Sequence, residues 1–113
     1  TAVSAHGKSI PAFHYMIALA GGNNIKCAEY ATFGTKELSQ NIIKALDERK
    51  ACLMSNHGQV AFGKSLSEAF ELAEEIENIC HQYINTIKLG EPKILSFAEM
   101  QKILDKVKNY KSG

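Results

Sequence analysis

The residue of this sequence best placed to do chemistry is His57, in the tetrapeptide Ser55-Asn56-His57-Gly58. Apolar runs at 51–54 and 59–62 flank it, each about one strand long, and Gly58 allows the chain to bend between them. We therefore expect His57 near a strand end, with an imidazole free to point into a cleft. An imidazole is a common metal ligand, but a catalytic zinc ion needs about three protein ligands and an open position. Taken alone, His57 is more typical of a solvated or core-satisfied residue than of a metal ligand, because one histidine cannot hold a metal.

The other candidates are three further histidines and a tyrosine in an apolar segment. His14 precedes Tyr15 within 12–20, where we expect it to be a structural hydrogen-bond donor in a buried helix. His81 lies inside a long helical segment without a partner in sequence, which favours a surface or interface position. A tyrosine in an apolar helix is by itself typical of a core or an interface.

The elements that must position these residues alternate between helical and extended patterns. Helices are expected at 12–20, from 35 to about 48, from 66 to about 89 and from about 97, and strands at 25–33, 51–54 and 59–62. Gly21-Gly22 ends the first helix, and the tail from 109 onward is polar and expected to be loose. The long helix carries an apolar stripe formed by Leu66, Phe70, Ala73, Ile76, Cys80, Tyr83, Ile84 and Ile87.

This order of elements predicts a mixed α/β domain. The two strands around His57 are separated by a tight turn, so the sheet must be at least partly antiparallel. Three or four strands are few for the apolar helix surface they have to cover. Glutamates at 71, 74, 75 and 77 lie opposite the apolar stripe and indicate a solvated helix face rather than a metal site.

Composition narrows the class of protein. The 113 residues suit one small domain or part of a larger one, with 45% apolar and 22% charged residues. A formal charge of +1 argues against a nucleic-acid partner, and no apolar run is long enough to span a membrane. The cysteines at 27, 52 and 80 are odd in number and far apart, which favours buried thiols in a reducing compartment. The chain opens without Met, so we expect a fragment or a processed chain.

Four motifs in order carry a resemblance to a known family. They are the segment Ile10-Pro11-Ala12-Phe13-His14-Tyr15-Met16, the pair Gly21-Gly22, the run from Cys27 to Leu38, and Asn56-His57-Gly58. In this order and at these spacings they resemble the class II aldolase/adducin family, most closely its L-fuculose-phosphate aldolase branch. The similarity covers essentially the whole chain.

The resemblance implies a fold and a metal site. The fold would be a three-layer α/β/α arrangement around a mainly antiparallel sheet, assembled as a cyclic homotetramer, with residues 1–113 as the C-terminal portion of a single domain. A divalent metal, usually zinc, would be held by three histidines, of which His57 matches the third. The other two form a His-x-His pair that the family carries before the point where this chain begins. The acid/base glutamate and the phosphate-binding loops lie further upstream. His6 stands past the expected pair and matches a non-ligand position.

The resemblance also gives roles to three aromatic residues. Tyr15 matches a tyrosine that donates a proton at the active site of a neighbouring subunit. Phe33 matches an aromatic residue that lines the substrate cleft. Tyr110 matches a tyrosine in the C-terminal tail that closes over substrate, with a one-residue gap in the correspondence.

The implied activity is the reversible cleavage of a sugar phosphate, such as L-fuculose 1-phosphate, to dihydroxyacetone phosphate and an aldehyde in the cytoplasm. Within the family, the same scaffold serves a pentulose-phosphate 4-epimerase and a methylthioribulose-phosphate dehydratase. A non-catalytic adducin-like binding or oligomerisation fragment is the alternative from a different class. Without the N-terminal half of the same protein, residues 1–113 are expected to be inactive, and either poorly soluble or able to fold only together with that half.

Overall fold

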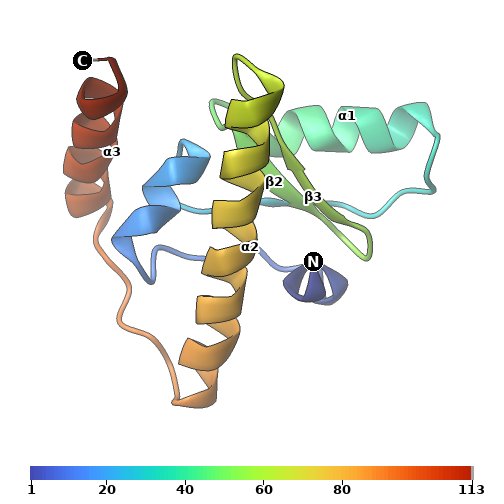
Figure 1. The fold of residues 1–113 in the computed structure, drawn as a ribbon. Coiled ribbons are helices and arrows are strands. Elements are labelled where there is room, and N and C mark those ends of the chain that lie inside the picture. The colour runs from blue at the N-terminus through green and yellow to red at the C-terminus, as the bar shows by residue number, and fades with distance from the viewer. Residues whose placement is uncertain (113) are drawn as a thin grey trace.

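The protein, seen here as a computed structural model, combines a small sheet with helices on both faces (Figure 1). The structure describes residues 1–112, with side chains described through Asn109. The helices are the 3₁₀-helices η1 (Ala2–His6) and η2 (Tyr15–Ala20) and the α-helices α1 (Lys36–Ala45), α2 (Leu66–Lys88) and α3 (Phe97–Ser112). The strands are β1 (Cys27–Ala28), β2 (Ala51–Met54) and β3 (Gly58–Ala61).

The sheet has the order β1-β2-β3 and is mixed. As the tight turn predicts, β2 and β3 are antiparallel, with Met54 opposite Gly58. The short strand β1 runs parallel to β2, with Ala28 beside Met54. An isolated antiparallel bridge between Ile10 and Ile25 adds backbone pairing next to this sheet. Because β1 and β2 are parallel, the segments that follow them leave the sheet at the same edge.

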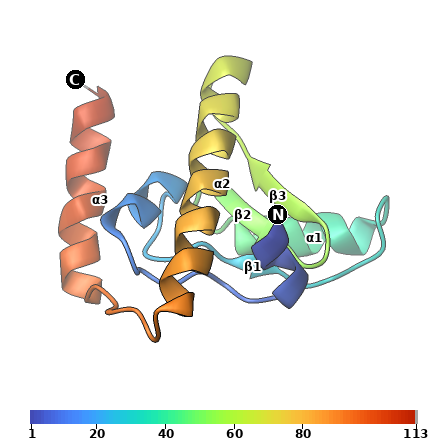
Figure 2. The same cartoon turned by 60° about the horizontal axis from the view of Figure 1, so that its bottom comes forward.

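The central strand β2 shows why the fold has layers. All of its residues are buried, and successive side chains point to opposite faces of the sheet. Ala51 and Leu53 pack into the main core with η2 and α2, whereas Cys52 packs with Ala45 of α1. Helix α1 therefore covers one face and α2 the other, as Figure 2 also shows. The expected α/β/α layering is confirmed.

Two predicted elements are shorter than expected. The helix expected at 12–20 is a 3₁₀-helix that begins only at Tyr15, because Pro11 to His14 form turns and a cap. The strand expected at 25–33 is reduced to Cys27–Ala28. Beyond Ala28 the chain leaves the sheet and exposes Tyr30 and Phe33, so its loose alternation does not reflect a half-buried strand.

The apolar stripe of α2 is buried only in its middle. Ile76 and Cys80 are buried as predicted, and Leu72 and Ile79, outside the predicted stripe, are buried with them. Leu66 and Phe70 were expected to face inward but are 88% and 63% exposed, because the first turns of α2 extend past the sheet. Phe97 at the start of α3 is likewise exposed. The backbone remains helical to Ser112, whereas the sequence predicts a loose tail from 109.

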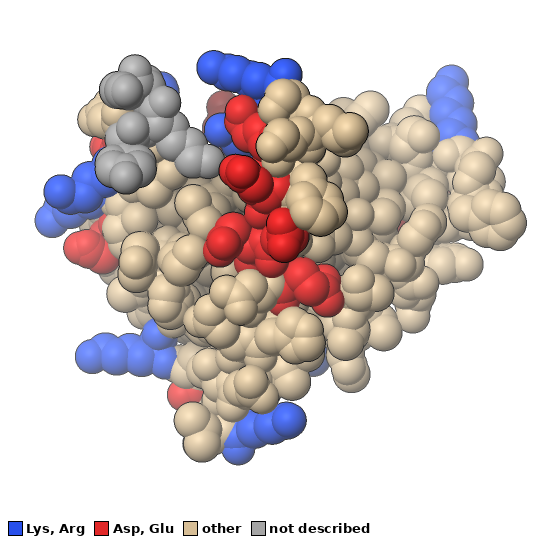
Figure 3. Space-filling view, viewed as in Figure 1, with Lys and Arg blue, Asp and Glu red and all other residues tan. Residues whose placement is uncertain are grey.

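Glutamates gather along the outer surface of α2, as Figure 3 shows. Glu71 and Glu74 are exposed, and Glu75 and Glu77 are partly exposed, which agrees with the solvated face predicted for this run. Within the described part of the chain, no helix is both long and apolar enough to cross a membrane.

The glycine pair after η2 packs closely against the loop before β2. Gly21 has a positive φ of 93° and ends η2, and a Cβ at this position would lie 3.1 Å from the Arg49 Cα and 3.2 Å from the Lys50 backbone nitrogen. The Arg49 guanidinium then donates to Asn24, with 2.6 Å between Nη2 and Oδ1 and 3.2 Å between Nε and the backbone oxygen. Glycine at 21 is thus required by both conformation and contact.

Replacing Gly21 by alanine should destabilise the fold by about 2–3 kcal/mol, combining left-handed strain with a tight contact between the new Cβ and the backbone at Arg49 and Lys50. Gly34→Ala is the matched control, since Gly34 also has a positive φ (77°) but a Cβ there would meet nothing within 4 Å. Gly34→Ala should cost only about 1 kcal/mol from strain alone. Urea midpoints at an unchanged m value measure both losses. Equal losses in the two variants would contradict the close approach of Gly21 and Arg49.

The cysteines are free thiols, with Cys52 and Cys80 buried and Cys27 half-buried. Burial, with a smaller contribution from nearby Cys27, raises the pKa of the Cys52 thiol to about 11. Burial also raises the pKa of Cys80. The Cys27 sulfur lies 3.3 Å from the Ser55 hydroxyl oxygen at the edge of the sheet.

Alkylation of the folded protein with iodoacetamide at about pH 8 should therefore modify Cys27 first. At this pH a thiol with a pKa of about 11 is only about one part in a thousand thiolate, and the thiolate is the nucleophile. Mass spectrometry should show one adduct in the native state and three adducts in urea. Native labelling of Cys52 as fast as Cys27 would count against the burial described above.

Candidate active site

The turn between β2 and β3 presents His57 at the end of a rigid pair of strands. The turn closes through the His57 N–H, which donates to the Met54 carbonyl oxygen at 3.1 Å. Asn56 adopts a left-handed conformation with φ of 58°, which asparagine tolerates better than most residues. The Ser55 N–H donates to the Ala28 carbonyl oxygen at 3.1 Å and ties the turn to β1. His57 itself is exposed, as the prediction of a free imidazole requires.

The 3₁₀-helix η1 braces this turn from the other side. The Ser4 carbonyl oxygen accepts from the Asn56 N–H at 2.9 Å, and the Ala5 carbonyl oxygen accepts from Asn56 Nδ2 at 3.3 Å. Ser4 is only 1% exposed, and its hydroxyl donates to the Thr1 carbonyl oxygen at 2.5 Å. The sequence carries no signal for this role, because nothing near Ser4 indicates that a segment 51 residues later packs on it.

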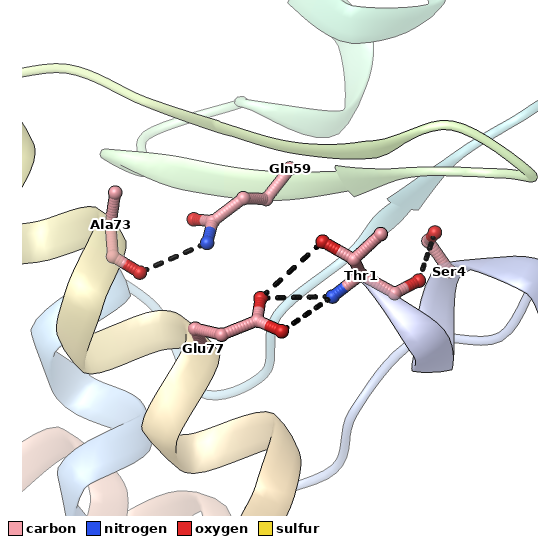
Figure 4. A network of polar contacts seen from close by, with 5 residues as sticks. All are labelled: Thr1, Ser4, Gln59, Ala73 and Glu77. Carbon is pink, nitrogen blue, oxygen red and sulfur yellow. Dashed lines mark hydrogen bonds and ion pairs between the residues drawn. The ribbon is translucent and has the colours of Figure 1, made fainter.

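Polar contacts also join η1 and β3 to α2 (Figure 4). The backbone nitrogen of Thr1 lies 2.9 Å from a Glu77 carboxylate oxygen. Gln59 of β3 donates through Nε2 to the Ala73 carbonyl oxygen at 2.9 Å. Its Oε1 is buried without a hydrogen-bond partner among the described residues. The turn that bears His57 is therefore held by η1 and β3, and both of these contact α2.

Phe33 lies in the segment between β1 and α1, which starts from the same sheet edge as the His57 turn. The Glu29 carbonyl oxygen accepts from Asn41 Nδ2 at 3.1 Å, which holds the beginning of the segment against α1. Thr35 caps α1 by accepting from the Leu38 N–H at 3.2 Å, and its hydroxyl donates to the Thr32 carbonyl oxygen at 2.7 Å. Phe33 is 80% exposed between these two anchors and is free to form the wall of a cleft.

Tyr15 lies elsewhere, at the first residue of η2. In both ribbon views η2 and the β2–β3 turn are on opposite sides of α2 (Figures 1 and 2). Tyr15 is 58% exposed, and its hydroxyl makes no hydrogen bond within the described residues 1–112. The structure thus brings the segments that carry His57 and Phe33 to one edge of the sheet and leaves η2, which begins at Tyr15, on the other side of α2.

The described residues do not form a complete metal site. Among them, no group of at least three His, Cys, Asp or Glu side chains is arranged to hold an ion. His6 and His81 are exposed on η1 and α2. His14 was expected to act as a donor, but its Nδ1 instead accepts from the Met16 N–H at 3.1 Å. His57 could therefore serve as one ligand only, and the side chain of Tyr110 lies outside the described residues.

Comparison with protein families and curated proteins gives consistent matches. The family model described as Class II Aldolase and Adducin N-terminal domain matches residues 1–84. An L-fuculose phosphate aldolase of Escherichia coli K12 is 49% identical over 111 residues, which is 97% of this chain and 52% of that protein. A 5-methylthioribulose-1-phosphate/5-deoxyribulose-1-phosphate aldolase of Rhodospirillum rubrum is 47% identical over 110 residues, covering 97% and 50% of the two chains. The chain thus spans about half the length of the curated relatives it matches.

Comparison with solved structures agrees. An L-fuculose 1-phosphate aldolase superposes with a TM-score of 0.89 at 41% identity, over 95% of this chain and 50% of that one. A structure titled as YgbL, a putative aldolase/epimerase/decarboxylase from Escherichia coli, superposes with a TM-score of 0.67 at 25% identity, over 84% and 45%. Nearly the whole length of this chain therefore matches the fold of half of the first structure.

Proposed function

This chain belongs to the class II aldolase and adducin family, and from that we propose that it is part of a metal-dependent class II aldolase. The enzyme would reversibly cleave a sugar phosphate, such as L-fuculose 1-phosphate, to dihydroxyacetone phosphate and an aldehyde. The observation that carries the proposal is the TM-score of 0.89 with an L-fuculose 1-phosphate aldolase at 41% identity. We place the enzyme in the cytoplasm, without a nucleic-acid or membrane partner.

His57 would be one ligand of a divalent metal, zinc being the ion that suits imidazole nitrogen in a tetrahedral site. The imidazole is exposed, and backbone hydrogen bonds hold the turn that carries it, so the position of this ligand does not depend on a bound metal. The described residues form no group of three His, Cys, Asp or Glu side chains that could hold an ion, so a complete site needs further ligands. Those ligands would come from the N-terminal half of the same protein.

Tyr15 would be the proton donor to the aldehyde fragment. In the condensation direction, its phenol would give a proton to the alkoxide oxygen that develops as the new carbon–carbon bond forms. In the cleavage direction, the phenolate would take that proton back. The exposed hydroxyl, free of hydrogen bonds to the described residues, is available for this task.

The separation of Tyr15 from His57 favours a site shared between subunits. In the ribbon views, η2, which begins at Tyr15, and the β2–β3 turn, which carries His57, lie on opposite sides of α2, and this arrangement supports a site to which two chains contribute. A homotetramer in which Tyr15 reaches the metal site of its neighbour would resolve this separation. Phe33 would line the cleft on the metal-bearing side, and Tyr110 would act from the C-terminal tail.

A second substrate class has specific support. The Rhodospirillum rubrum relative, 47% identical, is named for 5-methylthioribulose 1-phosphate and 5-deoxyribulose 1-phosphate. These substrates and L-fuculose 1-phosphate share the ketose 1-phosphate end and differ at the far end of the sugar. The choice between them would depend on the residues that contact the aldehyde portion.

The intact mass of the purified protein should be measured first, and release of dihydroxyacetone phosphate should then be assayed with two substrates, L-fuculose 1-phosphate and 5-deoxyribulose 1-phosphate. We expect activity that is lost on treatment with a chelator and returns with added zinc. A mass well above 12.4 kDa, or a second copurifying piece, is expected for the active form. Failure of the metal-loaded, complete protein to release dihydroxyacetone phosphate from either substrate would overturn the proposal.

A further inference from the structure

We propose that His14 is the positioning residue for Tyr15, which it orients through a backbone cap on η2 and a stack against the phenol ring. The inference deepens the proposed function and rests on it for the catalytic meaning of Tyr15. The structural part stands on contacts of His14 that the aldolase assignment does not use.

The first contact fixes the imidazole relative to the helix. His14 has extended backbone angles, φ of −151° and ψ of 145°, and occupies the N-cap of η2. Its Nδ1 accepts from the Met16 N–H at 3.1 Å, so Nδ1 carries no proton and the neutral ring has its hydrogen on Nε2. A histidine in this role takes the place of the Ser, Thr, Asp or Asn that usually caps a helix. The ring plane is thereby tied to the first turn of η2.

The second contact transfers this orientation to the tyrosine. The His14 and Tyr15 rings are stacked, with centroids 4.9 Å apart and planes at 23°. Tyr15 is 58% exposed and its hydroxyl makes no hydrogen bond within the described residues, so side-chain packing around it is sparse. The His14 ring is thus the surface that limits the rotation of the phenol.

The cap itself is anchored to the body of the protein. Phe13, next to His14, packs against Tyr83 of α2 with ring centroids 5.1 Å apart. The Ala12 carbonyl oxygen accepts from the Leu95 N–H at 2.9 Å, which ties the same segment to the approach to α3. The Ile17 N–H donates to the His14 carbonyl oxygen at 3.2 Å and begins η2. An aromatic chain from α2 through Phe13 and His14 therefore supports an exposed Tyr15.

Orientation of this kind bears on rate more than on substrate binding. A proton donor must lie within hydrogen-bond reach of the reacting oxygen, and a displacement of about 1 Å can lower the rate about a hundredfold. Tyr15 has no hydrogen bond of its own to hold the phenol before substrate arrives. Pre-alignment by His14 would supply that constraint.

Two variants separate the cap from the stack. His14→Asn keeps an oxygen acceptor for the Met16 N–H but removes the ring. His14→Phe keeps a ring of similar width but removes the acceptor. His81→Asn, on the exposed face of α2, is the matched control. The readouts are the NMR shifts of the Tyr15 ring in tyrosine-labelled protein, hydrogen exchange of the Met16 amide, and kcat and KM of the complete enzyme.

In His14→Asn, the NMR chemical shifts of the Tyr15 ring should change, because the stacked imidazole and its ring current are gone. The Met16 amide should stay protected from hydrogen exchange. In His14→Phe, the Met16 amide should exchange about fivefold to tenfold faster, as expected for loss of an N-cap. His14→Asn should lower kcat between about tenfold and a hundredfold with KM nearly unchanged. His81→Asn should leave every readout unchanged.

Unchanged chemical shifts of Tyr15 in His14→Asn would overturn the inference. If Tyr15→Phe shows that the enzyme depends on Tyr15, changed shifts in His14→Asn without a fall in kcat would overturn it as well. If His14→Asn does not fold, His14→Ser, which also keeps an oxygen acceptor and removes the ring, takes its place: changed Tyr15 shifts then support the inference and unchanged shifts overturn it. An enzyme that tolerates Tyr15→Phe would instead contradict the proposed function. In that case the NMR readouts alone decide whether His14 orients Tyr15.

Discussion

Replacing His57 by alanine should remove the bound metal and the aldolase activity together while leaving the fold intact. Outer-shell partners of a metal ligand are each worth about 10- to 100-fold in affinity, so loss of a ligand itself should cost more than about a hundredfold. The fold should survive because the turn is held by backbone contacts of Asn56 and of the His57 N–H, not by the imidazole. Zinc content after dialysis and the rate of dihydroxyacetone phosphate release measure the two effects.

The controls for this variant are His6→Ala and His81→Ala. Both histidines are exposed, as His57 is, but lie on η1 and α2 rather than at the turn. Each control should retain its zinc and its activity. Stoichiometric zinc in His57→Ala, or loss of zinc in His6→Ala, would contradict a metal site at the β2–β3 turn.

Tyr15→Phe should lower kcat by about 10²- to 10⁴-fold, the usual contribution of a positioned proton donor, with little change in KM. The fold should be unaffected, since the hydroxyl makes no hydrogen bond within the described residues and phenylalanine preserves the stack on His14. Steady-state kinetics and a urea unfolding curve measure the two properties. Tyr30→Phe is the matched control, because Tyr30 is 61% exposed and lies outside the proposed machinery. A kcat within about twofold of the wild type would exclude Tyr15 as the donor.

Mixed assemblies test whether the site is shared between subunits. Because η2 and the β2–β3 turn lie on opposite sides of α2, each proposed site would combine Tyr15 of one chain with His57 of a neighbouring chain. Refolding His57→Ala together with Tyr15→Phe should then restore up to about one quarter of the wild-type activity, since about a quarter of the sites would have both residues intact. No recovery above the two separate variants would argue against a shared site.

Local sequence signals predicted several elements well because their causes are local. Thr35 and Ser65 accept from backbone N–H groups three residues later and begin α1 and α2, as capping residues do. The apolar runs around His57 became the antiparallel pair β2 and β3. Asn56 and Gly58 supplied the turn. Each of these outcomes depends on residues within one turn or one hairpin.

The sequence misjudged elements whose burial depends on distant partners. Leu66 and Phe70 follow the helical period as faithfully as Ile76, yet only Ile76 lies beneath the sheet and η2. The run from Ile25 onward has strand-forming residues, but only Cys27 and Ala28 find a partner in β2. Periodicity reports which residues share a face, not how far the neighbouring layer extends.

By itself, the sequence determined the α/β class, the helix caps, the hairpin that presents His57 and, through its ordered motifs, the family. Only the tertiary structure decided that Ser4 and Ala5 brace the turn and that β1 runs parallel to β2. It also decided that η2 and the β2–β3 turn lie on opposite sides of α2. The reason is physical: caps and turns are satisfied within a few residues, whereas these placements depend on contacts between segments that meet only after the core of the sheet and α2 has packed.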